Sequence, residues 1–408
     1  MAPTRQRWLV LAVGLFAQTA ASSLVYGMPF LVPALRDQEG LSLARAGLLV
    51  SAPIAGLLVS LIAWGALADR YGERVVMASG LVVAVVSSSV VGLADLGVRG
   101  SAVGLFVAGV GGASVNAASG RLVMGWFPRD QRGLAMGIRQ TAQPLGVAIA
   151  AAALPTLAKD VGVSRSLLFP ASLCALAAVL VVTLAADPAR TPLDPTAAKP
   201  LSPYREPVLW RLHTASALLV LPQFAIAAFS VEYLVRRQDW PVAAAGGFVA
   251  VLQVCGAVGR IGTGVWSDRV GSRLRPMRQL AVASAAVMLV VAAGDQWSSW
   301  LAVAGLAVGA VVTVADNGLA FTATAEIAGS QWAGRALGIQ NTAQNVVASA
   351  APPLLGALVG ASGYAVGFGA VALFPLAAIV VTPVAAEAHR LRAAEREPVG
   401  VSGPPARP

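Results

Sequence analysis

The sequence predicts an all-α integral membrane protein whose twelve transmembrane helices form two pseudo-symmetric six-helix bundles. Hydrophobic residues make up 57% of the 408 residues, and charged residues only 12%, about half the charged share of an ordinary soluble domain. Apolar runs long enough to cross a hydrocarbon core of about 30 Å recur along the chain. The two halves also repeat the same polar motifs. Helices are the expected form because barrel strands would be shorter and half polar.

Charge and cysteine content narrow the function further. The net charge of +10 would suggest nucleic acid in a soluble chain, but in a membrane protein basic residues gather in cytoplasmic loops. We therefore expect the lipid bilayer, and no nucleic acid, as a partner. Cys174 and Cys255 lie inside apolar runs, without a C-x-x-C motif or a Cys/His cluster. We expect no disulfide framework, metal or cofactor.

A proline-rich connection divides the chain. Residues 187–207 contain six prolines, so they are expected to form a cytoplasmic linker between an N-terminal bundle (1–186) and a C-terminal bundle (208–385). The tail, 386–408, is charged and proline-bearing, and is expected to be disordered. The first apolar run is too long for a signal peptide and counts as a span. The predicted spans are 9–34, 46–67, 75–96, 100–124, 134–157, 166–186, 208–235, 243–265, 278–294, 299–324, 334–358 and 364–385.

Basic residues are unevenly distributed between the loops on the two sides of these spans. The side that contains the N-terminus, the linker and the tail has the larger number of arginines, and such loops face the cytoplasm. The sequence therefore predicts a multi-pass protein of the bacterial-type cell membrane with both termini in the cytoplasm. Arginines on the predicted cytoplasmic side include Arg70, Arg74, Arg129, Arg132, Arg269, Arg273, Arg275 and Arg278.

Two motifs occur once in each half. A loop reading G-x-x-x-D-R-x-G-x-R covers residues 65–74 and returns at 264–273. Inside the spans, Gly-Ile-Arg-Gln-Thr-Ala-Gln at 137–143 matches Gly-Ile-Gln-Asn-Thr-Ala-Gln at 338–344. Such duplication, with polar residues at matching positions, predicts one central site at the interface of the two halves.

The repeated loop, the span count and the linker resemble the major facilitator superfamily, a large group of secondary transporters. The resemblance implies alternating access, in which the two halves rock around a midplane site. It also implies that the loop keeps a cytoplasmic gate closed while the transporter faces outward, with acidic and basic partners at the ends of spans four and ten. The alternative is that these are ordinary loop charges that follow topology rules. The gating candidates are Gly65, Asp69, Arg70, Gly72, Arg74, Asp268, Arg269, Gly271, Arg121 and Glu326.

Polar residues inside the spans indicate which helices line the site. Spans three, six, nine and twelve contain no interior charge, Asn or Gln, so every third helix is predicted to be peripheral. Polar groups in the other spans are costly in lipid and are expected to face a cavity or another helix. The substrate-binding candidates are Tyr26, Asn116, Arg139, Gln143, Gln253, Arg260, Asn317, Asn341 and Gln344.

Arg260 is the principal candidate for substrate contact. It lies eight residues before Asp268, which places it about 12 Å deeper along a helix. The segment 259–264 resembles span eight of the monocarboxylate transporters and the nitrate/nitrite porters, which implies an arginine that holds an anion. A guanidinium forks to two oxygens and so suits a carboxylate. The alternative is a structural arginine that pairs with Asp316 or snorkels to the cytoplasm.

Two further residues refine the hypothesis. Nitrate porters have a second arginine in span two, where this chain has Leu61, so nitrate is not the expected anion. Asp316 is the only acid near the midplane, which makes it the candidate proton carrier. It could equally be a fixed counter-ion of Arg260.

The sequence thus predicts a monomeric secondary active transporter, not an enzyme, that couples protons to the transport of a small organic anion such as a monocarboxylate. Within the same class, the alternative is proton-driven efflux of drug-like amphipathic compounds. A membrane-embedded enzyme or a non-transporting sensor is less expected. His213 and His389 are the only histidines and lie at loop edges, and no G-x-x-x-x-G-K-[ST] motif is present.

Overall fold

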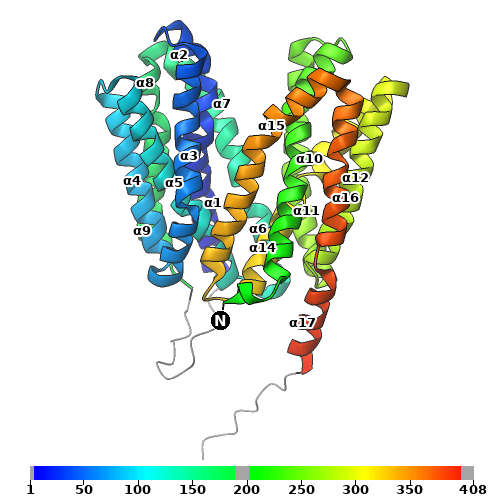
Figure 1. Cartoon of the computed structure of the whole chain (residues 1–408). Coiled ribbons are helices and arrows are strands. Elements are labelled where there is room, and N and C mark those ends of the chain that lie inside the picture. Colours follow the sequence, from blue (N-terminus) through cyan, green and yellow to red (C-terminus); the bar gives the residue numbers. More distant parts are fainter. Residues whose placement is uncertain (1–3, 189–201, 397–408) are drawn as a thin grey trace, which may run out of the picture.

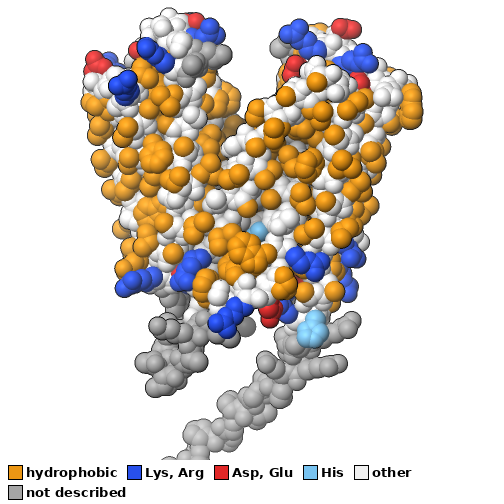
Figure 2. Space-filling model, viewed as in Figure 1, with side chains coloured by type: hydrophobic (Ala, Val, Ile, Leu, Met, Phe, Trp, Pro, Cys, Tyr) orange, Lys and Arg blue, Asp and Glu red, His pale blue; other side chains and the backbone are white. Residues whose placement is uncertain are grey.

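The computed structural model describes residues 4–188 and 202–396. Their helices form two bundles that meet at one end and splay apart at the other (Figure 1). The N-terminus and the C-terminal helix lie at the end where the bundles meet, which we call the closed end. Figure 2 shows a hollow between the bundles at the opposite, open end, and a hydrophobic band between charged residues at the two ends. The predicted all-α membrane fold is confirmed.

The span count also agrees with the prediction. Eleven helical stretches are long and apolar enough to cross a membrane, and the last of them runs from Ala333 to Arg390. That stretch holds the last two predicted spans, because Gly363 has φ 83° and interrupts the helical path there. The described residues thus provide the two sets of six spans.

The first bundle contains three interrupted spans, the first, the fifth and the sixth, the last of which breaks at Leu167 near its start. In the first, Pro29 and Pro33 occupy early positions of a 3-10 turn and of the short helix after it, where proline is tolerated because the N–H has no helical partner. In the fifth, the helix is interrupted at Gln140 and Thr141. The elements are α1 (Thr4–Gly27), η1 (Met28–Leu31), α2 (Val32–Asp37), α3 (Leu43–Tyr71), α4 (Glu73–Leu93), α5 (Gly97–Trp126), η2 (Arg129–Gln131), α6 (Arg132–Arg139), α7 (Ala142–Val161), α8 (Val163–Ser166) and α9 (Leu168–Leu184).

The second bundle has a comparable interruption in its fourth span, between Thr313 and Asp316. An interrupted helix frees backbone carbonyl and N–H groups that need other partners. The interruptions of the fifth and tenth spans lie next to the central site described below. The elements are η3 (Pro203–Arg205), α10 (Val208–Arg237), α11 (Val242–Val270), α12 (Leu274–Trp297), α13 (Ser299–Val312), α14 (Asn317–Ala328), α15 (Ala333–Val371), α16 (Leu373–Val381) and α17 (Val384–Arg396).

Small residues let the helices approach closely within a bundle. A methyl group at Gly109 on α5 would lie 1.9 Å from the carbonyl oxygen of Pro53 on α3, and one at Gly56 would lie 2.0 Å from that of Phe106. Membrane helices associate through such close packing, since lipid supplies little hydrophobic driving force between them. α4 and α9 lie at the outer edge of the first bundle, and α12 and α16 at that of the second (Figure 1). The predicted peripheral position of every third span is confirmed.

The expectation of a disordered tail is wrong for its first part. Residues Val384–Arg396 form α17, and Glu387 is buried against the start of α12. Its carboxylate accepts hydrogen bonds from the Ser272 hydroxyl at 2.5 Å and from the Arg273 N–H at 2.7 Å. This anchoring orders a segment whose composition alone predicts disorder. Residues 397–408, and 189–201 of the linker, lie outside the described part.

Candidate functional site

A polar cavity lies between the two bundles, and it is the candidate substrate site. Helices α1, α5 and α7 line it from the first bundle, together with Gln140 at the α6–α7 interruption. Helices α10, α11, α14 and α15 line it from the second bundle. Its lining residues are Gln18, Tyr26, Asn116, Gln140, Gln143, Val220, Gln223, Phe224, Arg260, Asn317, Phe321, Asn341, Gln344, Asn345 and Ala348.

In the first bundle, hydrogen bonds connect the cavity wall to a buried arginine. The Gln18 amide donates to the Asn116 side-chain oxygen at 3.2 Å and accepts from the Ser119 hydroxyl at 2.9 Å. Arg139 Nε then donates to the same hydroxyl at 2.9 Å. Arg139 is only 2% exposed and lies below the cavity lining. Its other donors reach Gln140 Oε1 at 2.7 Å and the Asn116 carbonyl at 3.1 Å. With the Met136 sulfur at 3.7 Å and the Phe321 ring at 5.7 Å, the described partners of this cation are all neutral.

Arg260 lines the cavity from α11 in the second bundle. Its Nη1 donates to the backbone carbonyl of Gln140 in the first bundle at 2.6 Å. That carbonyl is available because α6 ends at Arg139, and the end of a helix leaves its last carbonyls without helical partners. Arg260 Nε is buried and has no hydrogen-bond partner among the described residues. The guanidinium therefore retains donor capacity beside the cavity.

Asp316 lies close to Arg260 but is not paired with it. No ion pair within 4 Å joins them in the described structure, and Asp316 Oδ2 is buried there without a hydrogen-bond partner. The residue is 3% exposed and precedes α14 at the interruption of the tenth span. A buried acid is costly to keep charged unless a cation or a proton neutralises it.

In the second bundle, side-chain amides form a chain of their own. Asn317 donates to Gln223 Oε1 at 2.9 Å, and Gln344 donates to Asn317 Oδ1 at 3.1 Å and to the Ser216 hydroxyl at 2.7 Å. One contact crosses to the first bundle: the Tyr26 hydroxyl donates to Asn345 Oδ1 at 3.2 Å. The cavity wall is thus held in place mainly by amide groups.

Seven of the nine predicted substrate-binding residues line this cavity: Tyr26, Asn116, Gln143, Arg260, Asn317, Asn341 and Gln344. Arg139 lies beneath it, and Gln253 is exposed on α11 outside the lining. Four further amides of the lining were expected from the sequence to face a cavity or another helix but were not chosen as substrate-binding candidates: Gln18, Gln140, Gln223 and Asn345. Phe224 and Phe321 were not predicted at all. The four amides carried the same signal as those selected, a polar side chain inside a span. The two phenylalanines carried none.

At the closed end, Asp69 joins the two bundles. Its carboxylate accepts hydrogen bonds from the N–H groups of Gly334 at 2.8 Å and Arg335 at 3.1 Å, which begin α15 in the second bundle. Arg121 on α5 pairs with Asp69 at 2.9 Å and with Glu73 at 2.8 Å. A carboxylate at a helix N-terminus is favoured by the unpaired N–H groups and the helix dipole.

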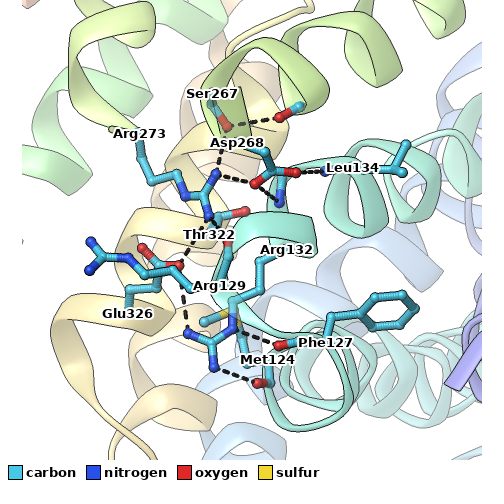
Figure 3. Close-up of polar contacts among 12 residues, drawn as sticks. Met124, Phe127, Arg129, Arg132, Leu134, Ser267, Asp268, Arg273, Thr322 and Glu326 are labelled. Carbon is cyan, nitrogen blue, oxygen red and sulfur yellow. Dashed lines mark hydrogen bonds and ion pairs between the residues drawn. The ribbon is translucent and has the colours of Figure 1, made fainter. Parts of the chain in front are cut away.

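Asp268 makes the equivalent contact in the opposite direction. It accepts hydrogen bonds from the N–H groups of Gly133 at 2.9 Å and Leu134 at 2.8 Å, at the start of α6 in the first bundle (Figure 3). Arg273 pairs with Asp268 at 2.5 Å and with Glu326 at 3.4 Å. Glu326 also pairs with Arg132 of the first bundle at 3.6 Å. The Glu326–Arg132 pair crosses between the bundles, as the helix caps do, whereas both pairs of Arg273 lie within the second bundle.

Glycines allow the backbones to meet beside both caps. A methyl group at Gly65 would lie 2.3 Å from the carbonyl oxygen of Gly334, and one at Gly264 would lie 2.1 Å from that of Gly133. No side chain fits at such distances. The first glycine of each repeated loop is therefore explained by contact with the other bundle.

The remaining gating candidates act within a bundle or lie at the surface. Gly72 and Gly271 have φ values of 101° and 67°, a conformation that glycine adopts without strain. Arg74 binds the Val182 carbonyl and donates its N–H to Asp187 at 2.8 Å, both in its own bundle. Arg70 and Arg269 are exposed, and Arg70 lies over the Tyr71 ring at 5.2 Å.

His213 is a buried residue that the sequence placed at a loop edge. It is 4% exposed on α10. One ring nitrogen contacts Gln340 Oε1 on α15, and the other lies 2.9 Å from the Tyr204 hydroxyl. Gln340 occupies the position in the second half that Arg139 has in the first. The imidazole thus completes the polar packing below the cavity in the second bundle.

Two membrane-spanning bundles around a central polar cavity, with caps that connect them at one end, define a secondary-transporter architecture. The sequence pattern of the Major Facilitator Superfamily matches residues 11–352. The chain belongs to this superfamily and is a multi-pass membrane transporter of that type.

Three similar proteins illustrate the relationship. The chain is 45% identical over 384 residues to an uncharacterised transporter of the major facilitator type from Mycobacterium tuberculosis, covering 93% of this chain and 85% of the relative. It is 30% identical over 117 residues to the hexuronate transporter of Bacillus subtilis, covering 29% of this chain and 28% of that protein. The crystal structure of FucP in the outward conformation superposes with a TM-score of 0.72 at 15% identity, over 92% of this chain and 97% of FucP.

Proposed function

We propose that the protein is a proton-coupled secondary active transporter of a small organic anion, of the monocarboxylate class. The observation that carries this proposal is the state of Arg260. Its guanidinium borders the central cavity, has one buried nitrogen without a hydrogen-bond partner among the described residues, and is held by a neutral carbonyl of the other bundle. A cation in the membrane interior is costly without an anion, and a carboxylate substrate would supply one.

Asp316 is the proposed proton carrier. It is buried near Arg260 without a hydrogen bond to Oδ2 and without an ion pair in the described structure. When a proton neutralises Asp316, Arg260 is left as the unbalanced charge that attracts the substrate anion. When Asp316 is ionised, it competes with the substrate for Arg260. This competition would link substrate binding to proton release and uptake.

The two carboxylate caps are the proposed gate. In this reading, the closed end faces the cytoplasm of a bacterial-type cell membrane, both termini are cytoplasmic, and the structure is the outward-facing state of a monomer. Asp69 and Asp268 each hold the start of a helix in the opposite bundle. Both contacts must break before the bundles can rock to the inward-facing state.

A partial relative supports the anionic substrate. The hexuronate transporter of Bacillus subtilis is similar to this chain over 117 residues. The substrate in its name, hexuronate, is a sugar that bears a carboxylate. The similarity covers under a third of this chain, so it agrees with the proposal without selecting among carboxylates.

The test is carboxylate-induced thermal stabilisation of the purified protein. Arg260→Lys retains the charge but loses the two-pronged geometry, so binding should weaken. Arg260→Ala should abolish carboxylate stabilisation, at a cost of about 2–5 kcal/mol. Gln253→Ala is the matched control, because Gln253 lies on the same helix outside the cavity. Full carboxylate stabilisation of Arg260→Ala would overturn the anion site and favour export of neutral or cationic compounds.

The double variant Arg260→Ala with Asp316→Ala separates substrate contact from charge balance. If Arg260 only balances Asp316, the double variant should recover the function that each single change removes. If Arg260 holds the substrate, the double variant should stay inactive. Uptake into proteoliposomes of labelled carboxylates, with and without a pH gradient, provides the measurement.

A further inference from the structure

The chemistry of the cavity wall restricts the substrate beyond its charge. Nine of the lining side chains are carboxamides, and Tyr26 adds a phenol. A carboxamide offers two N–H donors and an oxygen with two lone pairs. Arg260 is the single charged group of the lining. The wall is therefore built chiefly to exchange hydrogen bonds with neutral polar groups. The nine are Gln18, Asn116, Gln140, Gln143, Gln223, Asn317, Asn341, Gln344 and Asn345.

Part of this hydrogen-bonding capacity is unused within the protein. The Asn116 side chain is buried, with the residue only 8% exposed. Its amide nitrogen has no hydrogen-bond partner among the described residues. Gln143 is exposed into the cavity region and makes no hydrogen bond with the described residues. Buried polar groups are ordinarily satisfied, so the unpaired amide of Asn116 indicates a missing partner. A substrate group that both donates and accepts would supply it.

The lining argues against two other kinds of carboxylate. No acidic side chain is among the described residues that line the cavity, so the ammonium group of an amino acid would find amide oxygens there but no carboxylate to balance its charge. A carboxylate with an alkyl chain would displace water from the amides and leave them unpaired, at about 1–3 kcal/mol for each buried group. A hydroxylated chain avoids both costs, because each hydroxyl can donate to an amide oxygen and accept from an amide N–H.

Both bundles contribute to the cavity wall. The first supplies four of the amides and the Tyr26 phenol, and the second supplies the other five amides, Arg260 and two phenylalanines, Phe224 and Phe321. A ligand with a carboxylate at one end and hydroxyls along its chain would span this arrangement, with its C–H groups against the two rings. Contact with both bundles is what a substrate needs in order to favour their closure around it.

We propose that the substrate is a polyhydroxylated carboxylate, a sugar acid, and that the amide wall selects hydroxyls while Arg260 holds the carboxylate. This inference rests on the proposed anion transport and narrows its substrate class. Sites built to hydrogen-bond a hydroxyl reject analogues that lack it, often by large factors, because their polar groups are left unpaired.

The test uses three compounds with the same carbon chain. Gluconate carries the carboxylate and the hydroxyls, hexanoate carries the carboxylate alone, and sorbitol carries hydroxyls alone. Binding is measured by thermal stabilisation of the purified full-length protein over a concentration series. Gluconate should bind at least about tenfold more tightly than either hexanoate or sorbitol.

Two matched variants, one inside the cavity lining and one outside it, test whether the amides of the wall select for hydroxyl groups. Gln143→Leu keeps the bulk of the side chain, removes its amide and breaks no hydrogen bond within the described structure. It should weaken gluconate binding several-fold and leave hexanoate binding unchanged or tighter. Gln253→Leu removes the same group from α11 outside the lining and should alter neither. Arg260→Ala should weaken gluconate and leave sorbitol unaffected.

The outcomes separate this inference from the proposed function. Equal binding of hexanoate and gluconate would overturn the hydroxyl selection and leave anion transport standing. Equal binding of sorbitol and gluconate, insensitive to Arg260→Ala, would overturn anion transport and leave a hydroxyl-selective cavity. Binding of none of the three by the folded protein would overturn the sugar-acid proposal.

Discussion

Single carboxylates connect the bundles at the closed end. Asp69 and Asp268 belong to the same repeated motif, and each accepts two N–H groups from the first turn of a helix in the opposite bundle. Each contact therefore combines two hydrogen bonds with a favourable helix-dipole interaction. Since the contacts exist only while the bundles meet at this end, they stabilise one facing state rather than the fold.

Asp69→Asn tests this at the level of one residue. The amide loses the charge and can turn an N–H group toward the helix start, so the closed end should lose about 1–2 kcal/mol, roughly a tenfold shift between facing states. Transport should slow, while substrate affinity stays within a few-fold. Initial uptake rates over a range of substrate concentrations provide the measurement. Asp130→Asn, a change of an exposed acid at the same end, is the control, and a normal rate in Asp69→Asn would exclude a gating role.

Asp316→Asn tests proton coupling. The amide cannot release a proton, so accumulation driven by a pH gradient should be lost. Exchange of substrate across a membrane without a gradient should persist, because it requires no net proton movement. Both are measured in proteoliposomes with the same labelled carboxylate. Gradient-driven accumulation with normal pH dependence would show that another group carries the proton.

At the level of elements, α17 supports the gate from outside it. Glu387 accepts hydrogen bonds from Ser272, Arg273 and Leu274 at the start of α12, and the Arg273 side chain pairs with Asp268 and Glu326. The first bundle has a similar arrangement, since Asp187, just after α9, accepts the N–H of Arg74 at the start of α4. Each bundle thus ends on an acid that fixes the loop after its second span.

Glu387→Ala should destabilise this arrangement. It leaves the start of α12 without its cap, at a cost of about 1–3 kcal/mol, and frees the backbone that positions Arg273. The Tm in detergent should fall by a few degrees. Glu206→Ala is the control, because the exposed Glu206–Arg390 pair contributes little to stability. An equal Tm for the two variants would show that α17 is not structurally coupled to the gate loop.

The elements also show what local sequence can and cannot predict. The spans and their number follow from apolar runs, and the peripheral helices follow from the absence of charged residues, Asn and Gln inside every third span. The depth of Arg260 follows from its spacing to Asp268, since helical rise is fixed. The caps on Gly334 and Gly133 could not be predicted, because they join residues far apart in the chain. The order of α17 was missed for the same reason: Glu387 meets a partner more than a hundred residues earlier.

On the scale of the whole molecule, the duplicated sequence produces two equivalent sets of contacts that hold the closed end together. The contact of Gly65 with Gly334 and that of Gly264 with Gly133 lie beside the caps made by Asp69 and Asp268. Each pair brings one backbone against another without intervening side chains. The closed end therefore depends on two symmetric contacts, and a change that enlarges either glycine acts on the arrangement of the bundles rather than on one bundle's interior.

Gly334→Ala gives the corresponding prediction. The added methyl group would lie 2.3 Å from the Gly65 carbonyl oxygen and 2.6 Å from Asp69 Oδ1. Backbone cannot yield as a flexible side chain can, so the bundles must separate at this end, and the population should shift toward the opposite facing state. Spin labels across both ends should report a longer distance at the closed end and a shorter one at the open end.

Gly264→Ala, whose methyl group would lie 2.1 Å from the Gly133 carbonyl oxygen, should shift the distances in the same direction. Gly262→Ala is the control, because its added methyl group would have no heavy atom within 4 Å. It should leave both distances unchanged. Unaltered distances in Gly334→Ala and Gly264→Ala would show that backbone contact at the glycines does not hold the end closed.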